Sequence, residues 1–166
     1  MRTSTRTSVL SLLAALLWLA AAPSGAWQAP SPPDQDQLFG TWRLILERSR
    51  YQPGPAPKSE TRIYEPDGTG VKATIRRVLA DGRPEVVEYS ADFDNPSPVT
   101  GSADIDRILM KRIDAYTAES VLSHAGRVFA TARRVVARDG KSMTITVRRE
   151  GNERVNNVAY YEREMP

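Results

Sequence analysis

Apolar and polar side chains alternate with a period of two along most of the chain after residue 38. In 71–76 the apolar residues stand at odd positions, and 87–93 alternates in the same way. Asp81-Gly82 and Asp139-Gly140 are hairpin-turn signals between alternating runs. This pattern is typical of half-buried strands. It predicts nine strands, at 38–47, 61–65, 71–76, 87–93, 108–113, 116–122, 127–138, 141–149 and 155–163.

No helical periodicity follows residue 30, so the sequence predicts an all-β fold. A meander of short strands removes its exposed edges by closing, which favours a single antiparallel up-and-down β-barrel of 8–10 strands. Segments 49–59 and 94–104 are rich in turn residues and are predicted to be long loops. A two-sheet sandwich is the alternative, and only these two loops are long enough for its crossings.

The first 26 residues have the pattern of a secretory signal peptide. Arg2 and Arg6 precede an apolar run over 9–22, with cleavage expected after Ala22 or Ala26. A membrane anchor is the competing interpretation, but a run of about 14 residues is shorter than the roughly 20 that span a bilayer.

The expected organisation is a signal peptide (1–26), a disordered tether (27–37) rich in proline, and one barrel domain (38–166). The protein is therefore expected in the periplasm or outside the cell, as a monomer without a membrane span in its mature chain.

The amino-acid composition excludes several kinds of functional site. The chain has no cysteine, which excludes disulfides, thiol nucleophiles and thiolate metal sites. Removing Arg2 and Arg6 from the 23 basic residues leaves 21 against 20 acidic ones, so the mature chain is nearly neutral. This balance does not indicate a nucleic-acid partner. No metal or other cofactor is expected.

Catalytic residues are not expected either. His124 is the only histidine and lies in a turn, so it cannot build a multi-histidine metal site. Asp92 and Asp94, and Asp104 and Asp106, flank the second long loop and could work as acid and base. Aspartates beside loops are far more often turn residues.

Gly40-x-Trp42 at the start of the meander resembles the opening motif of the calycins, which include lipocalins and fatty-acid-binding proteins. The resemblance implies that Trp42 closes the base of the barrel and that an arginine from a late strand lies across its ring. Arg163 and Arg134 are the candidates for that arginine. Glycine lets the chain pass closely, and a guanidinium over an indole gains a cation–π contact.

An ordered set of motifs also resembles bacterial exported lipocalin-like proteins of no established activity. The chain lacks the disulfide and C-terminal helix of classical lipocalins, and the helix pair of fatty-acid-binding proteins. The motifs are Gly40–Trp42, Pro53–Ser59, Tyr64–Gly68, Pro98–Gly101 and Val155–Val158.

Arginine inside a predicted strand is the most informative polar feature. Arg133 and Arg134 must point to opposite faces, and the face of Val128, Ala130, Ala132 and Val136 is the more apolar. Arg134 is therefore predicted to point inward, where it needs a partner. An inward carboxylate or carbonyl, the Trp42 ring and the acidic head of a ligand are the three options.

The main hypothesis is a non-catalytic barrel that binds an apolar or amphipathic small molecule. The molecule could be anionic, because an inward arginine could pair with its acidic head. The interior is predicted to hold Leu44, Leu46, Val71, Ala73, Ile75, Val87, Ala91, Ile145 and Val147 beside the candidate ligand contacts. Those contacts are Arg134, Tyr89, Phe93, Met110, Met143 and Tyr160, while Gly40, Trp42 and Arg163 are predicted to close the barrel.

Two other functions are compatible with the sequence. A solid barrel could use loops 49–59 and 94–104 as a protein-interaction or inhibitor module. The other function is that of a cofactor-free enzyme. An interior carboxylate with a displaced pKa beside Tyr89 or Arg134 would favour it.

Overall fold

The computed structural model describes residues 36–151 and 157–165, so the predicted signal peptide and nearly all of the predicted tether lie outside the described residues. None of the described residues forms a helix long and apolar enough to cross a bilayer. The elements are β1 (Gly40–Leu44), the 3₁₀ helix η1 (Leu46–Arg48), β2 (Arg50–Tyr51), β3 (Ser59–Asp67), β4 (Gly70–Val78), β5 (Pro84–Ala91), β6 (Pro96–Thr100), β7 (Arg107–Asp114), β8 (Thr117–His124), β9 (Arg127–Val136), β10 (Ser142–Arg149) and β11 (Asn157–Glu164).

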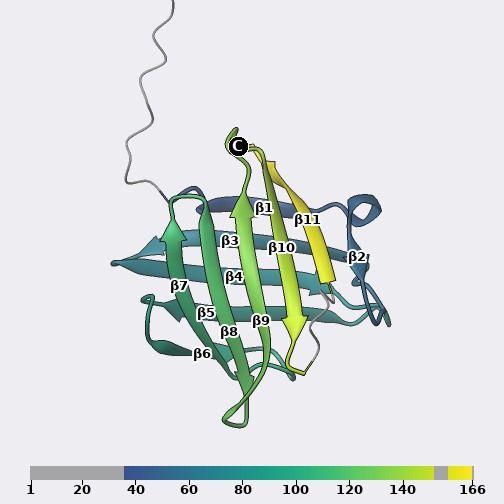
Figure 1. Cartoon of the computed structure of the whole chain (residues 1–166). Coiled ribbons are helices and arrows are strands. Elements are labelled where there is room, and N and C mark those ends of the chain that lie inside the picture. Colours follow the sequence, from purple (N-terminus) through teal and green to yellow (C-terminus); the bar gives the residue numbers. More distant parts are fainter. Residues whose placement is uncertain (1–35, 152–156, 166) are drawn as a thin grey trace, which may run out of the picture. The chain divides into compact units, whose positions relative to one another are not determined.

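Ten of these strands form a closed antiparallel barrel, which confirms the predicted fold class and excludes the sandwich. Each strand from β3 to β10 pairs with the next in sequence, and β1 closes the ring between β3 and β11. Trp42 of β1 therefore stands opposite Arg62 of β3 and Arg163 of β11. Figure 1 shows β3, β4 and β5 running across the direction of β7 to β10 on the other side of the barrel.

The eleventh strand, β2, pairs with β11 as β1 does, but at the beginning of β11. The Ser49 hydroxyl donates to the Ile45 carbonyl at 2.7 Å and accepts from the Tyr160 amide at 2.9 Å, which bends the chain through η1. Two predictions are thereby wrong. The first strand ends at Leu44 rather than at residue 47, and the predicted loop 49–59 begins with a short strand.

The predicted loop 94–104 is also wrong in part, because it contains β6. Val99 donates its amide to Asp106 on the β7 side. The nitrogens of Pro96 and Pro98 therefore face β5, where the ladder has only two residue pairs. Proline can stand in this strand because it faces the side with few ladder bonds to lose.

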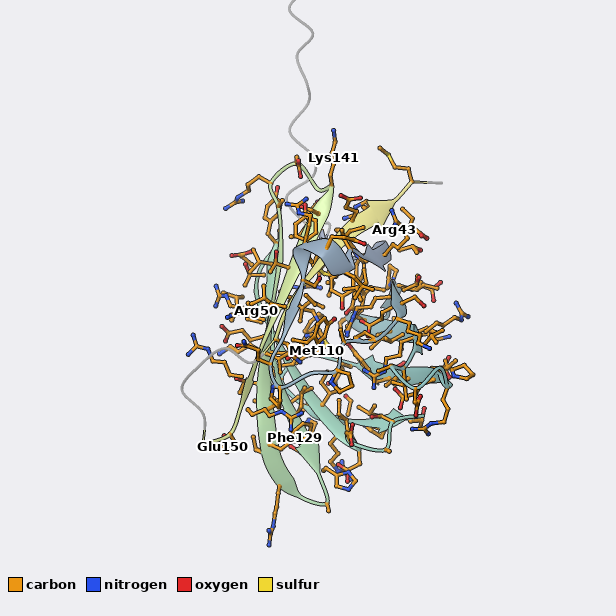
Figure 2. All side chains as sticks on the ribbon, turned by 90° about the vertical axis from the view of Figure 1, so that its right-hand side faces the viewer. Arg43, Arg50, Met110, Phe129, Lys141 and Glu150 are labelled. Atoms are coloured by element: carbon orange, nitrogen blue, oxygen red, sulfur yellow. The ribbon has the colours of Figure 1, made fainter. Side chains whose placement is uncertain are left out.

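The interior near Trp42 is solid. Trp42, Met110, Met143 and Tyr89 are all buried there, and Figure 2 shows Met110 in the middle of the barrel. Small residues alternate with large ones across the strands; Ala73 on β4, for example, lies between Tyr64 and Tyr89 on its two neighbours. This alternation lets large side chains on one strand lie over small ones on the next, as in a close-packed core.

Two predicted orientations are corrected, those of Tyr160 and Val128, together with the strand position of Phe93. Tyr160 faces outward under the Arg48 guanidinium, 3.5 Å from its ring centroid, and the buried tyrosine of β11 is Tyr161. Phe93 lies beyond the end of β5 with a φ of 56°, and its ring is 4.5 Å from the Arg112 guanidinium. It is partly buried against the core. An irregularity in the β8–β9 register leaves Val128 exposed.

Candidate ligand-binding cavity

The closed end of the barrel is built around the Trp42 indole. Its Nε1 donates to the Leu38 carbonyl at 2.8 Å, and the Arg163 guanidinium lies 4.1 Å from the ring centroid. Arg163 also donates to the carbonyls of Gly140, Phe39 and Gln37, which ties the end of β11 to two turns. A Cβ on Gly40, whose φ is +129°, would collide with this guanidinium. Of the two candidate arginines, Arg163 therefore takes the position over the indole.

Arg134 points inward, as the pattern of β9 predicted, and is only 3% exposed. It donates to the hydroxyls of Tyr64 at 3.3 Å, Tyr89 at 3.5 Å and Ser120. No carboxylate within the described ranges lies at ion-pair distance from it. Arg134 is thus held by three side-chain hydroxyl groups.

The opposite half of the barrel is hollow. A cavity of about 870 Å³ opens between loop 52–58, the β4–β5 turn and the β8–β9 turn. Its apolar lining comes mainly from β8 to β11: Leu122, Phe129, Ala130, Ile145, Val147 and Ala159. The buried and half-buried polar lining on the other side comes mainly from β2, β3 and β4, with Tyr51, Glu60, Arg62 and Arg77. The lining also includes exposed polar residues of the turns and strand ends: Asp81, Asp104, His124, Arg127 and Arg149.

The cavity does not touch the six ligand contacts predicted from the sequence. Tyr89, Met110, Met143 and Arg134 belong to the solid half. Phe93 lies beyond the end of β5, and Tyr160 lies on β11 but faces outward. Two residues predicted to lie in the interior, Ile145 and Val147, do line the cavity. The sequence did not single out Glu60, Arg62 or Tyr161.

A buried ion pair forms the polar wall of the cavity. The Glu60 carboxylate accepts from Arg62 Nε and from the Tyr161 hydroxyl through Oε1, both at 2.6 Å. Arg62 also donates to the Tyr161 hydroxyl at 3.1 Å and to Tyr64 at 3.3 Å. Arg77 lies 3.9 Å from Glu60 Oε2 and pairs closely with Glu85. We call Glu60, Arg62 and Tyr161 the polar triad.

Electrostatics fix the charge of this wall. Burial alone would raise the pKa of Glu60, but the Arg62 guanidinium and the Tyr161 hydroxyl outweigh it and lower that pKa. Burial raises the pKa of the Tyr161 hydroxyl well above its usual value, and burial also raises that of Tyr51, to about 12. The cavity therefore presents a carboxylate, a guanidinium and two protonated phenols at neutral pH.

Tyr64 connects the triad to Arg134. Burial would raise the pKa of Tyr64, but the guanidiniums of Arg134 and Arg62 on its two sides lower it. Its hydroxyl accepts from both at 3.3 Å. The polar groups of the two halves thus form one continuous hydrogen-bonded chain through the barrel.

A second hollow, of about 520 Å³, lies along β7 to β10 on their outer face. Its charged lining includes Lys111, Glu119 and Arg133, and the last two form an exposed ion pair. Exposed pairs of this kind contribute little to binding or stability. The interior cavity, with its desolvated polar triad, is the stronger candidate site.

The triad makes stability depend on pH. Because the folded pKa of Glu60 is lowered, its contribution is complete above the unfolded value of about 4.3 and disappears as pH falls through the folded pKa. We expect the free energy of unfolding, measured by urea titration, to fall less steeply below pH 5 in Glu60→Gln than in the parent protein. Glu119→Gln, on the outer face, is the matched control and should keep the parent slope. Parallel curves for Glu60→Gln and the parent would contradict the lowered pKa.

Two members of the polar triad, Glu60 and Arg62, leave one signal in the sequence. Glu60, Arg62 and Tyr64 occupy alternate positions, so a strand over them places opposite charges on the same face, two residues apart. A rule that turns charged residues toward solvent assigns this face outward, and the pair was missed for that reason. Within the described part of the chain, no group of three or more metal-binding side chains occurs.

No protein-family model matches the chain, and no curated protein matches its sequence significantly.

Proposed function

We propose that this chain is an exported, lipocalin-like barrel that binds a small apolar or amphipathic molecule and does not transform it. The observation that carries the proposal is the cavity of about 870 Å³ in one half of the barrel. Ligand pockets are typically about 300–1,000 Å³ in volume, mostly apolar, with a few placed polar groups. This cavity has such a volume, and its lining combines an apolar wall with polar and charged side chains.

The two walls of the cavity suit an amphipathic guest. The apolar wall, with Phe129, Ile145 and Val147, would cover a hydrocarbon or aromatic body. The polar triad on the facing side would orient a polar head group. Buried polar groups gain more from a matched partner than exposed ones because the surrounding dielectric is low.

Binding is favoured over catalysis by the state of Glu60. An interior carboxylate would favour a cofactor-free enzyme, and Glu60 is one. Its lowered pKa leaves it without a proton to donate at neutral pH and makes it a weak base. General acid–base catalysts instead have pKa values near the working pH.

Export is supported by the N-terminal sequence alone, in the charged, apolar and small-residue order of residues 1–26. The absence of cysteine is compatible with a barrel that is stabilised by burial and backbone pairing in an oxidising compartment.

Binding can be tested with the neutral fluorophore N-phenyl-1-naphthylamine. We expect saturable enhancement of its emission by the purified protein, and at least about tenfold weaker binding to Ala130→Trp, because the indole would fill the cavity. Thr131→Trp is the matched control, since the neighbouring residue faces outward. Ala159→Leu is a milder filling variant for the case in which Ala130→Trp does not fold.

The outcome that contradicts the proposal is a protein that does not bind the fluorophore. Equal binding by the Ala130→Trp, Ala159→Leu and Thr131→Trp variants would contradict it as well, since it would place the fluorophore outside the barrel.

A further inference from the structure

The polar triad has hydrogen-bonding capacity left over, on both of its charged members. Within the described residues, Glu60 Oε1 accepts two hydrogen bonds, while Oε2 makes only the 3.9 Å contact with Arg77. Arg62 uses Nε and Nη1, and its Nη2 donates to no described group. A carboxylate accepts at both oxygens and a guanidinium carries five N–H groups. One open acceptor and at least two open donors therefore remain.

These open atoms belong to groups that line the cavity. Glu60 and Arg62 are neighbours on the inward face of β3, and both contribute to its wall. Their side chains are 3% and 14% exposed, so both charged groups are largely shielded from water. A guest in the cavity would meet an acceptor and donors beside each other.

The charges of this wall cancel. Glu60 is paired with Arg62, and Arg77 is paired with Glu85, so a guest meets no excess charge from these four groups. The other charged side chains that line the cavity are exposed to solvent, which screens their charge from a head group at the triad: Asp81, Asp104, Arg127 and Arg149. A guest carboxylate would stand beside Glu60, and two carboxylates sharing one site repel each other. The remaining buried guanidinium, Arg134, does not line the cavity and has its own hydroxyl partners. An ionised head group is therefore disfavoured.

We propose that the cavity selects neutral amphipathic molecules whose head carries a hydrogen-bond donor and an acceptor side by side, as a primary carboxamide does. The head N–H would donate to Glu60 Oε2 and its carbonyl would accept from Arg62. The apolar body would lie on the wall of β8 to β11. This selectivity rests on the proposed function, and it assigns the ligand class that the cavity takes.

Four probes with the same ten-carbon acyl or alkyl chain separate the alternatives: decanamide, decanoate, methyl decanoate and decylamine. Each competes with N-phenyl-1-naphthylamine for the wild-type protein at pH 7.5, below its aggregation concentration. We expect decanamide to bind at least about tenfold more tightly than the other three, which corresponds to about 1.4 kcal/mol. Methyl decanoate measures the loss of the donor alone, because it keeps the carbonyl.

The variant Glu60→Gln tests the assignment to the triad. Removing the carboxylate charge leaves Arg62 without its closest counter-charge, so decanoate should gain and overtake decanamide. Glu119→Gln makes the same chemical change on the outer face and should leave the order of the four probes unchanged. Circular dichroism melts establish that both variants are folded. The wild-type order needs no variant and decides the proposal by itself.

The inference would be overturned if decanoate or decylamine bound as tightly as decanamide. It would also be overturned if the wild-type protein bound the fluorophore and none of the four probes displaced it. Both results would leave the binding barrel intact. A protein that does not bind the fluorophore would instead remove the proposed function and this inference together.

Discussion

Replacing Trp42 by alanine is expected to lower the free energy of unfolding by about 3–5 kcal/mol, the range for large buried aromatic residues. The indole is 0% exposed, and its removal would leave a void at the closed end. It would also leave the Leu38 carbonyl without the 2.8 Å hydrogen bond from Nε1, and Arg163 without the ring beneath it. Urea denaturation followed by far-UV circular dichroism measures the loss without relying on tryptophan fluorescence.

A matched control comes from an aromatic residue on the outer face. Tyr160→Ala removes a ring that stacks with Arg48 but is only half-buried, so its loss should be about 1 kcal/mol. A loss of less than about 1 kcal/mol for Trp42→Ala would contradict the closing role of this residue. The whole arrangement of β1 against β3 and β11 would then be in question.

The strict period-two runs allowed most of the barrel to be predicted. In β4 the apolar residues Val71, Ala73 and Ile75 all point inward, as their alternation requires. Backbone hydrogen bonding then leaves a closed sheet as the simplest way for such a meander to satisfy its edges. The strands that were missed, β2 and β6, are those in which proline or short length hides the pattern.

The orientation of β11 shows why alternation alone can fail. Tyr160 and Tyr161 are adjacent and equally apolar, so the pattern does not say which one is buried. Arg163 supplies the missing information, because a residue that lies over the Trp42 ring shares its face with Tyr161 and not with Tyr160. Combining the closing arginine with the strand period would have given the correct face.

Whether the barrel is hollow could not be predicted, because large and small inward residues alternate in filled and empty barrels alike. The structure separates the two halves by what faces each small residue. Ala73 lies between two tyrosines and is covered, whereas Ala130 and Ala159 line the open cavity. Which of these arrangements occurs depends on packing across the barrel, between strands that are distant in sequence.

The second large effect is expected from Arg62→Met, which should lower the free energy of unfolding by about 3–5 kcal/mol. Methionine fills much of the same space but leaves the Glu60 carboxylate, 3% exposed, without its closest guanidinium. Removing one partner of a buried ion pair is far more damaging than removing both, because an uncompensated charge remains in a region of low dielectric. Arg77, at 3.9 Å and already paired with Glu85, would compensate only part of it.

The matched control is Arg43→Met, on the outer face of β1. Arg43 is 56% exposed and its ion pairs with Glu162 and Glu164 are both 3.8 Å long, so the loss should stay below about 1 kcal/mol. Adding Glu60→Gln to Arg62→Met should restore part of the stability, because it removes the stranded charge. Equal small losses for the two arginine variants, or no recovery in the double variant, would contradict a buried charge pair in the wall of the cavity. Urea denaturation at pH 7.5 measures the three variants against the parent.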